Sequence, residues 1–531
     1  MATPSLAMIP SAYADSKVYS VLPNNGDGDF TFNRDSSATR VGSNGLIQTV
    51  GFFGSELILS TMINTSYNTF NEASSSGFHA INTAGTSQRA GTVDEIIFVT
   101  GKIYTVNIDV SVVSGNAPFF RARQDISTSP TLFSGQLTDG NNVITFTSTD
   151  TLTGVLEFSN TAAAEYRVSN VSIKEVTGDQ PRLNYDISNG VVQSCPSLLL
   201  EPASTNLITY SEDFSQSDWS KNSITVESNA IISPDGTQNA DKITKSASNA
   251  LIRQFIATTG ANTFSVYVKK GSLYWVRLYI ASSTESAECW FDLENGLTGF
   301  TSGNPESVEI VSLSNGWYKC IITKNTTDIT NFRIYPSQAD DDTSGTSGDI
   351  YIYGAQVETL SYATSYIPTN GAIQTRAAET CFGAGTVSTF SDSEGVLYVE
   401  VAALANDGTS RQISLSDGSS ATNKVSLIYT STSNQLQAFI RSGGSIAFNV
   451  NEILSNTTNN NKIALKYKAN DFALWVNGIE LATETSGNAP TSLNVLDFDD
   501  ADGTSDFYGN CKDIRVYNEA LTDAQLQTLT T

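Results

Sequence analysis

Short runs of alternating apolar and polar residues, each bounded by turn-forming residues, extend along almost the whole chain. The run GKIYTVNIDVSV, from Gly101, places apolar side chains at alternate positions, and Asn44-Gly45 marks one of several tight turns. A period of two is that of an antiparallel strand with one face on a core and the other in water. The pattern therefore predicts an all-β protein.

The strand-like runs fall into three groups, which predict three consecutive antiparallel β-sandwich modules at residues 51–178, 179–380 and 381–531. At roughly 100–200 residues per domain, a chain of 531 residues has room for three or four domains. The second group echoes the first, since TFSVYVKKG from Thr263 parallels YTVNIDVSV and DIYIYGAQVE from Asp349 parallels YRVSNVSIKE. We therefore expect two copies of one jelly-roll-like sandwich, followed by a third sandwich.

The two ends of the chain differ from the modules. Residues 1–50 contain turn signals and too few apolar residues for a core of their own. They are interpreted as an extended N-terminal arm that packs on its own downstream domains or on another protein. Helical signals are nearly absent, and the clearest lies in the C-terminal tail, where Thr522 and Gln525 have capping-box spacing ahead of Leu526 and Leu529.

The charge balance excludes some functions. Acidic residues outnumber basic ones by 54 to 29, a net charge of −25, whereas binding to nucleic acid needs a basic surface. The same balance argues against docking on anionic lipid. No run approaches the ~18 apolar residues of a membrane span, and no Lys or Arg precedes the cleavage-like Ala12-Tyr13-Ala14, so no secretion signal is expected.

The five cysteines are far apart and form no C-x-x-C pattern. We therefore expect buried, reduced thiols rather than a disulfide framework or a zinc site. Cys289 and Cys320 fall on predicted strands of one module and could meet.

Several segments resemble a family of phage virion structural proteins that form fibres and spikes. KVYSVLPNNGDGDFTFNRDSSATRVGSNGLIQTV, at residues 17–50, is similar to the opening of these proteins. PRLNYD from Pro181, SLLLEPASTNLITYSEDFS from Ser197, and then NGWYKC, GDIYIYGAQVE, TSYIPT and TRAAE continue the resemblance to about residue 380. In the family the first two segments lie close together, so residues 51–178 are interpreted as an inserted domain. The resemblance implies a virion surface protein, on head or tail, made in the host cytoplasm.

The third module resembles concanavalin A-like and laminin-G-like lectin sandwiches. FALWVNGIEL and the late segment KDIRVYNEALTDAQLQ carry this likeness. In phage fibres such modules are thought to contact glycans. The resemblance implies a lectin-like third module beside a carbohydrate-binding-like second one.

Candidate sugar contacts are aromatic side chains with polar neighbours, because a sugar stacks its C–H face on an aromatic ring and hydrogen bonds through its hydroxyls. Tyr274, Trp275 and Arg277 on one strand fit this pattern. Trp475 is a further candidate, and Trp290 and Trp317-Tyr318 are weaker ones. The alternative for each is packing in a sandwich core, and Trp475, which faces opposite to its neighbours Leu474 and Val476, is open between the two.

A candidate calcium loop lies in LDFDDADGTSD, because calcium binds several oxygen ligands. Its carboxylates are Asp497, Asp499, Asp500 and Asp502, with Asp506 close by. The loop lacks the closing glutamate of an EF-hand, so the alternative is a solvated acidic loop. No other cofactor is expected.

Catalysis has little support in the sequence. His79 is the only histidine and lies in the Ser/Gly-rich segment SSGFHAINTAG. Glycan hydrolysis uses two carboxylates about 5–10 Å apart, and no signature singles out such a pair. We therefore expect no enzyme.

The leading hypothesis is a virion fibre or spike. Its arm binds other virion proteins, its modules contact host polysaccharide, and it assembles as a dimer or trimer. A secreted bacterial surface adhesin and a glycan depolymerase are the alternatives.

Overall fold

The computed structural model describes residues 2–51, 56–58, 61–83, 86–92, 96–126, 128–176 and 179–531. It divides into two compact units, one formed by residues 51–178 and the other by residues 1–50 together with 179–531. The prediction of an all-β fold is confirmed, because the described residues form antiparallel sheets with one α-helix, α1 (Asp523–Thr530). None of the described helices is long and apolar enough to cross a membrane.

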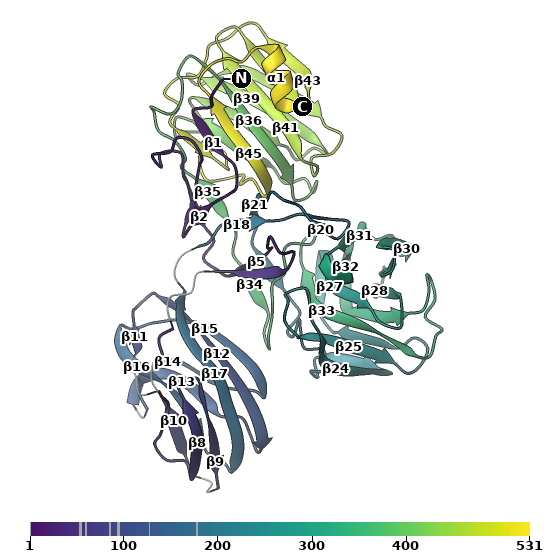
Figure 1. The fold of residues 1–531 in the computed structure, drawn as a ribbon. Coiled ribbons are helices and arrows are strands. Elements are labelled where there is room, and N and C mark those ends of the chain that lie inside the picture. The colour runs from purple at the N-terminus through teal and green to yellow at the C-terminus, as the bar shows by residue number, and fades with distance from the viewer. Residues whose placement is uncertain are drawn as a thin grey trace. The chain divides into compact units, whose positions relative to one another are not determined.

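The unit of residues 51–178 is a sandwich of two antiparallel sheets (Figure 1). One sheet contains β14 (Thr128–Gln136), β13 (Phe119–Asp125), β16 (Leu152–Asn160), β10 (Gln88–Gly91), β7 (Ile63–Asn64) and β11 (Ile96–Phe98). The other contains β15 (Gly140–Thr147), β12 (Ile103–Ser114), β17 (Ala164–Val176), β9 (Gly77–Asn82) and β8 (Thr69–Ser74). The alternation expected for β12 is present, since Tyr104, Val106 and Ile108 are buried in a core that the two sheets enclose.

The second module is one large antiparallel sheet that folds back on itself. Its strands are β24 (Ile224–Ile231), β25 (Ala240–Lys245), β33 (Gly348–Glu358), β27 (Thr258–Lys270), β32 (Trp317–Ser337), β28 (Trp275–Ser282), β29 (Ala287–Asp292), β30 (Leu297–Ser302), β23 (Trp219–Asn222), β26 (Leu251–Gln254) and β31 (Ser307–Ser312). A 3-10 turn, η1 (Ser314–Gly316), leads into β32. The long strand β32 pairs with β27 in its first half and with β28 in its second, so it belongs to both layers.

The third module packs a sheet of eight strands on a sheet of five. The larger contains β18 (Arg182–Asn184), β21 (Ser197–Leu200), β45 (Gly509–Tyr517), β36 (Glu394–Ala403), β41 (Asn461–Lys468), β42 (Phe472–Val476), β43 (Ile479–Glu484) and β1 (Leu6–Met8). The smaller contains β40 (Ser445–Ile453), β39 (Gln435–Ser442), β38 (Lys424–Tyr429), β37 (Arg411–Ser416) and β44 (Val495–Asp497). Strands β18 and β21 lie in the segment assigned above to the second module, so the larger sheet crosses that boundary. Leu198 and Leu200 explain this, because their side chains belong to the third module's core.

Short sheets join the remaining segments. They are β2 (Tyr13–Ala14), β3 (Lys17–Val18) and β4 (Phe30–Asn33) with β35 (Thr380–Phe382); β5 (Ala38–Val41) with β6 (Ile47–Val50); β19 (Ile187–Ser188) with β20 (Val191–Val192); and β22 (Ser204–Asn206) with β34 (Gln374–Arg376).

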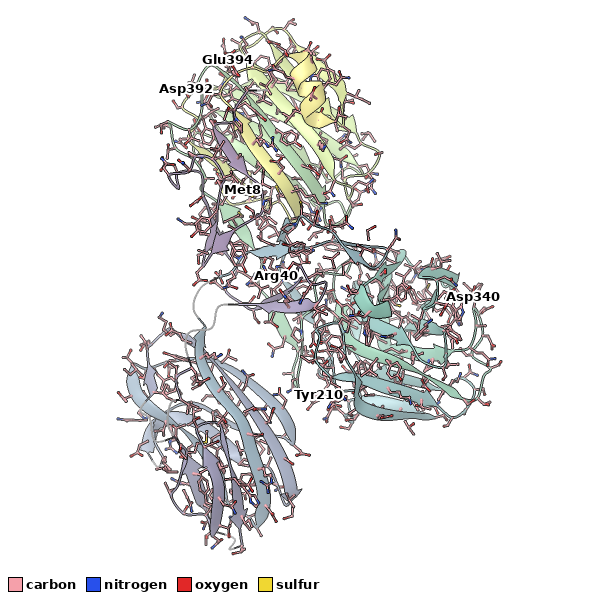
Figure 2. All side chains as sticks on the ribbon, viewed as in Figure 1. Met8, Arg40, Tyr210, Asp340, Asp392 and Glu394 are labelled. Atoms are coloured by element: carbon pink, nitrogen blue, oxygen red, sulfur yellow. The ribbon has the colours of Figure 1, made fainter. Side chains whose placement is uncertain are left out.

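Residues 1–50 are built into this unit rather than extended from it. Strand β1 pairs with β45, and Figure 2 labels Met8 on β1 beside that strand. Leu6, Met8, Phe30 and Phe32 are buried in the third module's core. Of the two alternatives for the arm, packing on its own downstream domains is the one seen. Attachment to another protein stays a prediction.

A buried network of three arginines and two glutamates fixes the place where these segments meet. Glu379 accepts hydrogen bonds from Arg34 Nη1 and Arg182 Nε, each at 2.8 Å. Glu201 accepts from Arg182 Nη1 at 2.7 Å and lies 3.0 Å from Arg376 Nη1. Burial alone would raise the pKa of Glu201, but Arg182 and Arg376 lower it to about 2. The network therefore joins the N-terminal segment, the segment after residue 179 and the end of the second module.

The two ends of the unit of residues 51–178 leave the rest of the chain at neighbouring points. Arg34 donates from Nη2 to the carbonyl oxygen of Val50 at 3.3 Å and from Nη1 to that of Gln180 at 3.0 Å. One guanidinium group thus spans both ends. Each unit also has cores of its own. Neighbouring ends are what an inserted domain requires, and the insertion itself stays a prediction.

Excision of residues 51–178, with a short Gly-Ser linker between Val50 and Asp179, is expected to leave the larger unit folded. All five tryptophans of the chain lie outside the excised segment, so their fluorescence reports on the larger unit alone. The thermal midpoint followed by that fluorescence should stay within about 3 °C of the full chain's value. Loss of the cooperative transition would show that the insertion helps to hold the larger unit together.

The cysteines form no disulfide among the described residues. Cys289, Cys320, Cys381 and Cys511 are buried thiols, as expected, whereas Cys195 is exposed.

Candidate functional site

The outer face of the second module gathers aromatic and charged side chains on adjacent strands. In β28, Val276, Leu278 and Ile280 point into the core, because they fall at alternate positions and are fully buried. Trp275, Arg277 and Tyr279 therefore share the opposite face of the strand, where each is half-buried.

The strand register extends this face sideways. Arg277 lies opposite Trp290 on β29 and opposite Tyr335 on β32. Directly paired residues in antiparallel strands carry their side chains on the same face. The three strands β29, β28 and β32 therefore hold these side chains in one row, with Tyr279 and its neighbours in the next.

Arg277 lies at the centre of three aromatic rings. Its guanidinium carbon is 4.9 Å from the ring centre of Tyr279, 4.7 Å from that of Trp290 and 4.5 Å from that of Tyr335. The same guanidinium forms an ion pair with Glu288. Cation–π contacts of this kind are worth about 0.5–2 kcal/mol each. Together with the ion pair they fix the arginine, whose side chain is 14% exposed.

The accessible part of the face lies toward Trp275 and β30. Phe300 is 45% exposed, and its ring contacts that of Trp290 edge-on at 5.7 Å. Trp290 itself is only 3% exposed, and its indole N–H has no hydrogen-bond partner among the described residues. Asp340, which Figure 2 labels in a loop at the margin of the module, accepts the Phe300 backbone N–H at 2.7 Å. Exposed rings beside carboxylate and guanidinium groups are the elements of a sugar-binding face.

Of the residues predicted from the sequence, Trp275 and Arg277 lie together here, whereas Tyr274 does not join them. Tyr274 precedes β28 and is 48% exposed, and Lys270 Nζ lies 5.5 Å from its ring centre. Neighbouring residues of an extended chain point to opposite sides, which separates Tyr274 from Trp275. Tyr279, Tyr335 and Arg333 also lie on this face and were not among the residues predicted from the sequence. Tyr335 and Arg333 are brought into place only by the pairing of β32 with β28. Tyr279 lies on β28 and has the same two-residue spacing from Arg277 as Trp275, so that spacing was an available signal.

Of the two alternatives left open for Trp475, packing in a core is the one that the structure shows. Trp475 is only 7% exposed and packs in a small core with Leu526 and Leu529 of α1. It does face away from Leu474 and Val476, as expected, but that face of β42 is covered by the C-terminal helix. The sequence did contain a signal for this helix, namely the capping-box spacing of Thr522 and Gln525. The structure confirms the capping box, because Gln525 Oε1 accepts the Thr522 N–H at 2.9 Å.

The acidic loop of the third module uses its carboxylates internally. Asp497 accepts the Gly383 N–H at 2.6 Å, Asp499 accepts the Ala501 N–H at 2.6 Å, and Asp502 accepts the Ser420 hydroxyl. Burial raises the pKa of Asp497 to about 6. Within the ranges that the structure describes, no three His, Cys, Asp or Glu side chains converge as metal ligands. These contacts favour a loop whose carboxylates are used in hydrogen bonds to the loop and to neighbouring segments, and calcium binding at Asp497, Asp499, Asp500 and Asp502 stays a prediction.

His79 lies on β9 and is held by its neighbours. Its Nδ1 is 2.8 Å from Asn71 Oδ1 and its Nε2 is 3.1 Å from Glu165 Oε1. Both contacts are between adjacent strands, so the histidine has a place in the packing of the sheet.

A close carboxylate pair occurs in the second module. The Tyr353 hydroxyl lies 3.0 Å from Glu212 Oε1 and 3.1 Å from Asp235 Oδ2, and the Tyr366 hydroxyl donates to Glu212 at 3.0 Å. Burial raises the pKa of Glu212. Because these carboxylates are occupied by internal donors, the pair acts as packing between the loop at Asp235 and the sheet.

Fold and site together define an all-β protein of antiparallel sandwich modules, one of which carries an aromatic and arginine-rich outer face. Neither a protein-family model nor a curated protein sequence matches the chain.

Several solved structures are similar at low identity. The CBM40 module of the Ruminococcus gnavus IT-sialidase, bound to α2,3-sialyllactose, is 18% identical over 28% of this chain and 88% of its own, with a TM-score of 0.25. The CBM22 tandem of Paenibacillus barcinonensis Xyn10C is 12% identical over 58% and 98%, with a TM-score of 0.19. Domains LG4-5 of mouse laminin α1 are 9% identical over 65% and 94%, with a TM-score of 0.20. Similarity at this level carries no argument about function.

Proposed function

We propose that this protein is a structural protein of a phage particle, a fibre or spike that contacts host-surface glycans through the outer face of its second module. The observation that supports glycan contact is the cluster of Trp275, Arg277 and Tyr279 on one face of β28. Half-buried rings next to fixed charged groups are suited to a sugar, which offers both C–H faces and hydroxyls.

The virion part of the proposal rests on the sequence resemblance at residues 17–50 and about 180–380. Attachment to other virion proteins through the N-terminal segment is supported by three of its apolar side chains, Ile9, Tyr19 and Val21, which are exposed, whereas Leu6, Met8, Phe30 and Phe32 are buried. Assembly as a dimer or trimer, presence on the virion surface and the absence of catalysis belong to the same proposal.

Replacing Trp275 with alanine is expected to weaken glycan binding about tenfold, because an aromatic platform contributes roughly 1–1.5 kcal/mol and 1.4 kcal/mol is a factor of ten. Tyr274→Ala is the matched control, since the adjacent ring points to the other side of the strand and should change affinity less than about twofold. The measurement is binding of the full chain to a glycan array, followed by titration of the strongest ligand.

Equal loss in both variants, or in neither, would contradict the assignment of the site to this face. Circular dichroism and tryptophan fluorescence establish that each variant is folded. The same incubations are assayed for new reducing ends, and their release would replace binding with depolymerisation as the function.

A further inference from the structure

Two arginines meet on this face without a carboxylate between them. Arg253 on β26 lies directly opposite Arg333 on β32, and both side chains are half-buried. Neither has an acidic side chain within ion-pair distance among the residues described. Like charges directly opposite one another in a sheet destabilise it. In a chain with a net charge of −25, which has acidic groups to spare, such a pair calls for a specific reason.

Arg333 is held in one orientation by its neighbours. Its Nε donates to Asn331 Oδ1 at 2.6 Å, and its Nη1 donates to the Tyr335 hydroxyl at 3.2 Å. Its guanidinium carbon lies 4.9 Å from the ring centre of Tyr279. Among the residues that the structure describes, Arg333 Nη2 has no hydrogen-bond partner, so a fixed guanidinium group offers donors at the surface of the face.

Arg253 is placed beside it in a similar way. Its guanidinium carbon lies 4.5 Å from the ring centre of the exposed Phe255, and its Nε is buried without a hydrogen-bond partner among the described residues. The nearest acid in the same row of the sheet is Glu288, two strands from Arg333, which at about 4.8 Å per strand is roughly 10 Å away. Glu288 already pairs with Arg277.

We infer that Arg253 and Arg333 bind the negative group of an acidic polysaccharide, whose sugars carry carboxylate or phosphate groups. This inference rests on the proposed glycan function and names its ligand class. A planar guanidinium donates two parallel hydrogen bonds to carboxylate or phosphate. An anion placed between the two arginines removes their mutual repulsion, while the Tyr279 ring in the same row holds the Arg333 guanidinium in place.

The test compares the full chain's binding to oligogalacturonate with its binding to the methyl ester of the same oligomer, which has the same sugar and no charge. We expect the acid to bind at least tenfold more tightly than the ester. We also expect the difference to shrink when salt is raised, because charge interactions at a surface are screened. A polyglycerol phosphate oligomer forms the second arm and separates phosphate from carboxylate recognition.

Arg253→Gln and Arg333→Gln are each expected to weaken binding of the acid about tenfold and to leave the ester unchanged. Arg441→Gln is the matched control, because Arg441 lies in the third module, over the ring of Phe439, and likewise has no carboxylate partner among the described residues. It should change neither affinity.

Two failures are distinguishable. If acid and ester bind equally, and Trp275→Ala still weakens both, the inference is overturned and the glycan function stands. If no oligomer binds, or if binding ignores both Trp275 and the arginines, the proposed face is wrong, and the inference fails with it.

Discussion

A Glu379→Ala variant is expected to lose about 3–5 kcal/mol of unfolding free energy in the larger unit, because it leaves the buried Arg34 without its carboxylate partner and removes one of the two carboxylates that pair with Arg182. Glu379 is fully buried and accepts from Arg34, from two nitrogens of Arg182 and from the Glu201 backbone N–H at 2.9 Å. Alanine removes every one of these acceptors. A charge buried without a partner costs far more than the intact network contributes, so the loss is large even if the network itself adds little stability.

Urea unfolding of the full chain, followed by tryptophan fluorescence, measures this loss, since residues 51–178 contain no tryptophan. Glu294→Ala is the matched control, because it breaks the exposed ion pair with Lys270 and should cost at most about 1 kcal/mol. If the two variants unfold at the same urea concentration, the buried network is not what holds together the N-terminal segment, the segment after residue 179 and the end of the second module. Unfolding would then have to be limited by the apolar cores alone.

The sequence predicts the strands well, because a period of two depends only on neighbours along the chain. Tyr104, Val106 and Ile108 on β12 and Val276, Leu278 and Ile280 on β28 lie on the face that their spacing indicates. The role of residues 1–50 is harder to predict. Leu6 and Met8 are too few to form a core, but they complete one that includes Ile463 and Ile514, which lie more than 450 positions later. No pattern among neighbouring residues of the sequence indicates pairing between segments so far apart.

Some residues of the candidate site could likewise be predicted from the sequence, and others could not. Trp275 and Arg277 share a strand, so their common face follows from their spacing. Arg253 and Arg333 are 80 residues apart, and only the register of β26 against β32 brings them together. Trp475 illustrates the opposite case. Its strand alternation is right, but the element that covers its outward face, α1, lies about 50 residues later in the chain.

Deletion of residues 1–33 is expected to abolish folding of the third module. The deletion removes five fully buried side chains, Leu6, Met8, Val18, Phe30 and Phe32, together with the pairing of β1 with β45. At about 1.5–3 kcal/mol for each buried side chain, the loss is roughly 8–15 kcal/mol, which equals the whole stability of a typical domain. Arg34 is retained, so the effect is separate from that of the buried network.

Limited proteolysis with mass spectrometry measures this result, and the expected outcome is rapid cleavage within residues 381–531. The excision of residues 51–178 is the control, since it removes almost four times as many residues and should leave this region resistant. If the truncated chain resists proteolysis like the full chain, residues 1–33 would be a detachable arm after all. If the chain that lacks residues 1–33 unfolds, its failure to be incorporated into particles would follow from unfolding alone. Such a failure would then say nothing about whether residues 1–33 bind other virion proteins. That role would then have to be tested by substituting the exposed Ile9, Tyr19 and Val21, which leave the core intact.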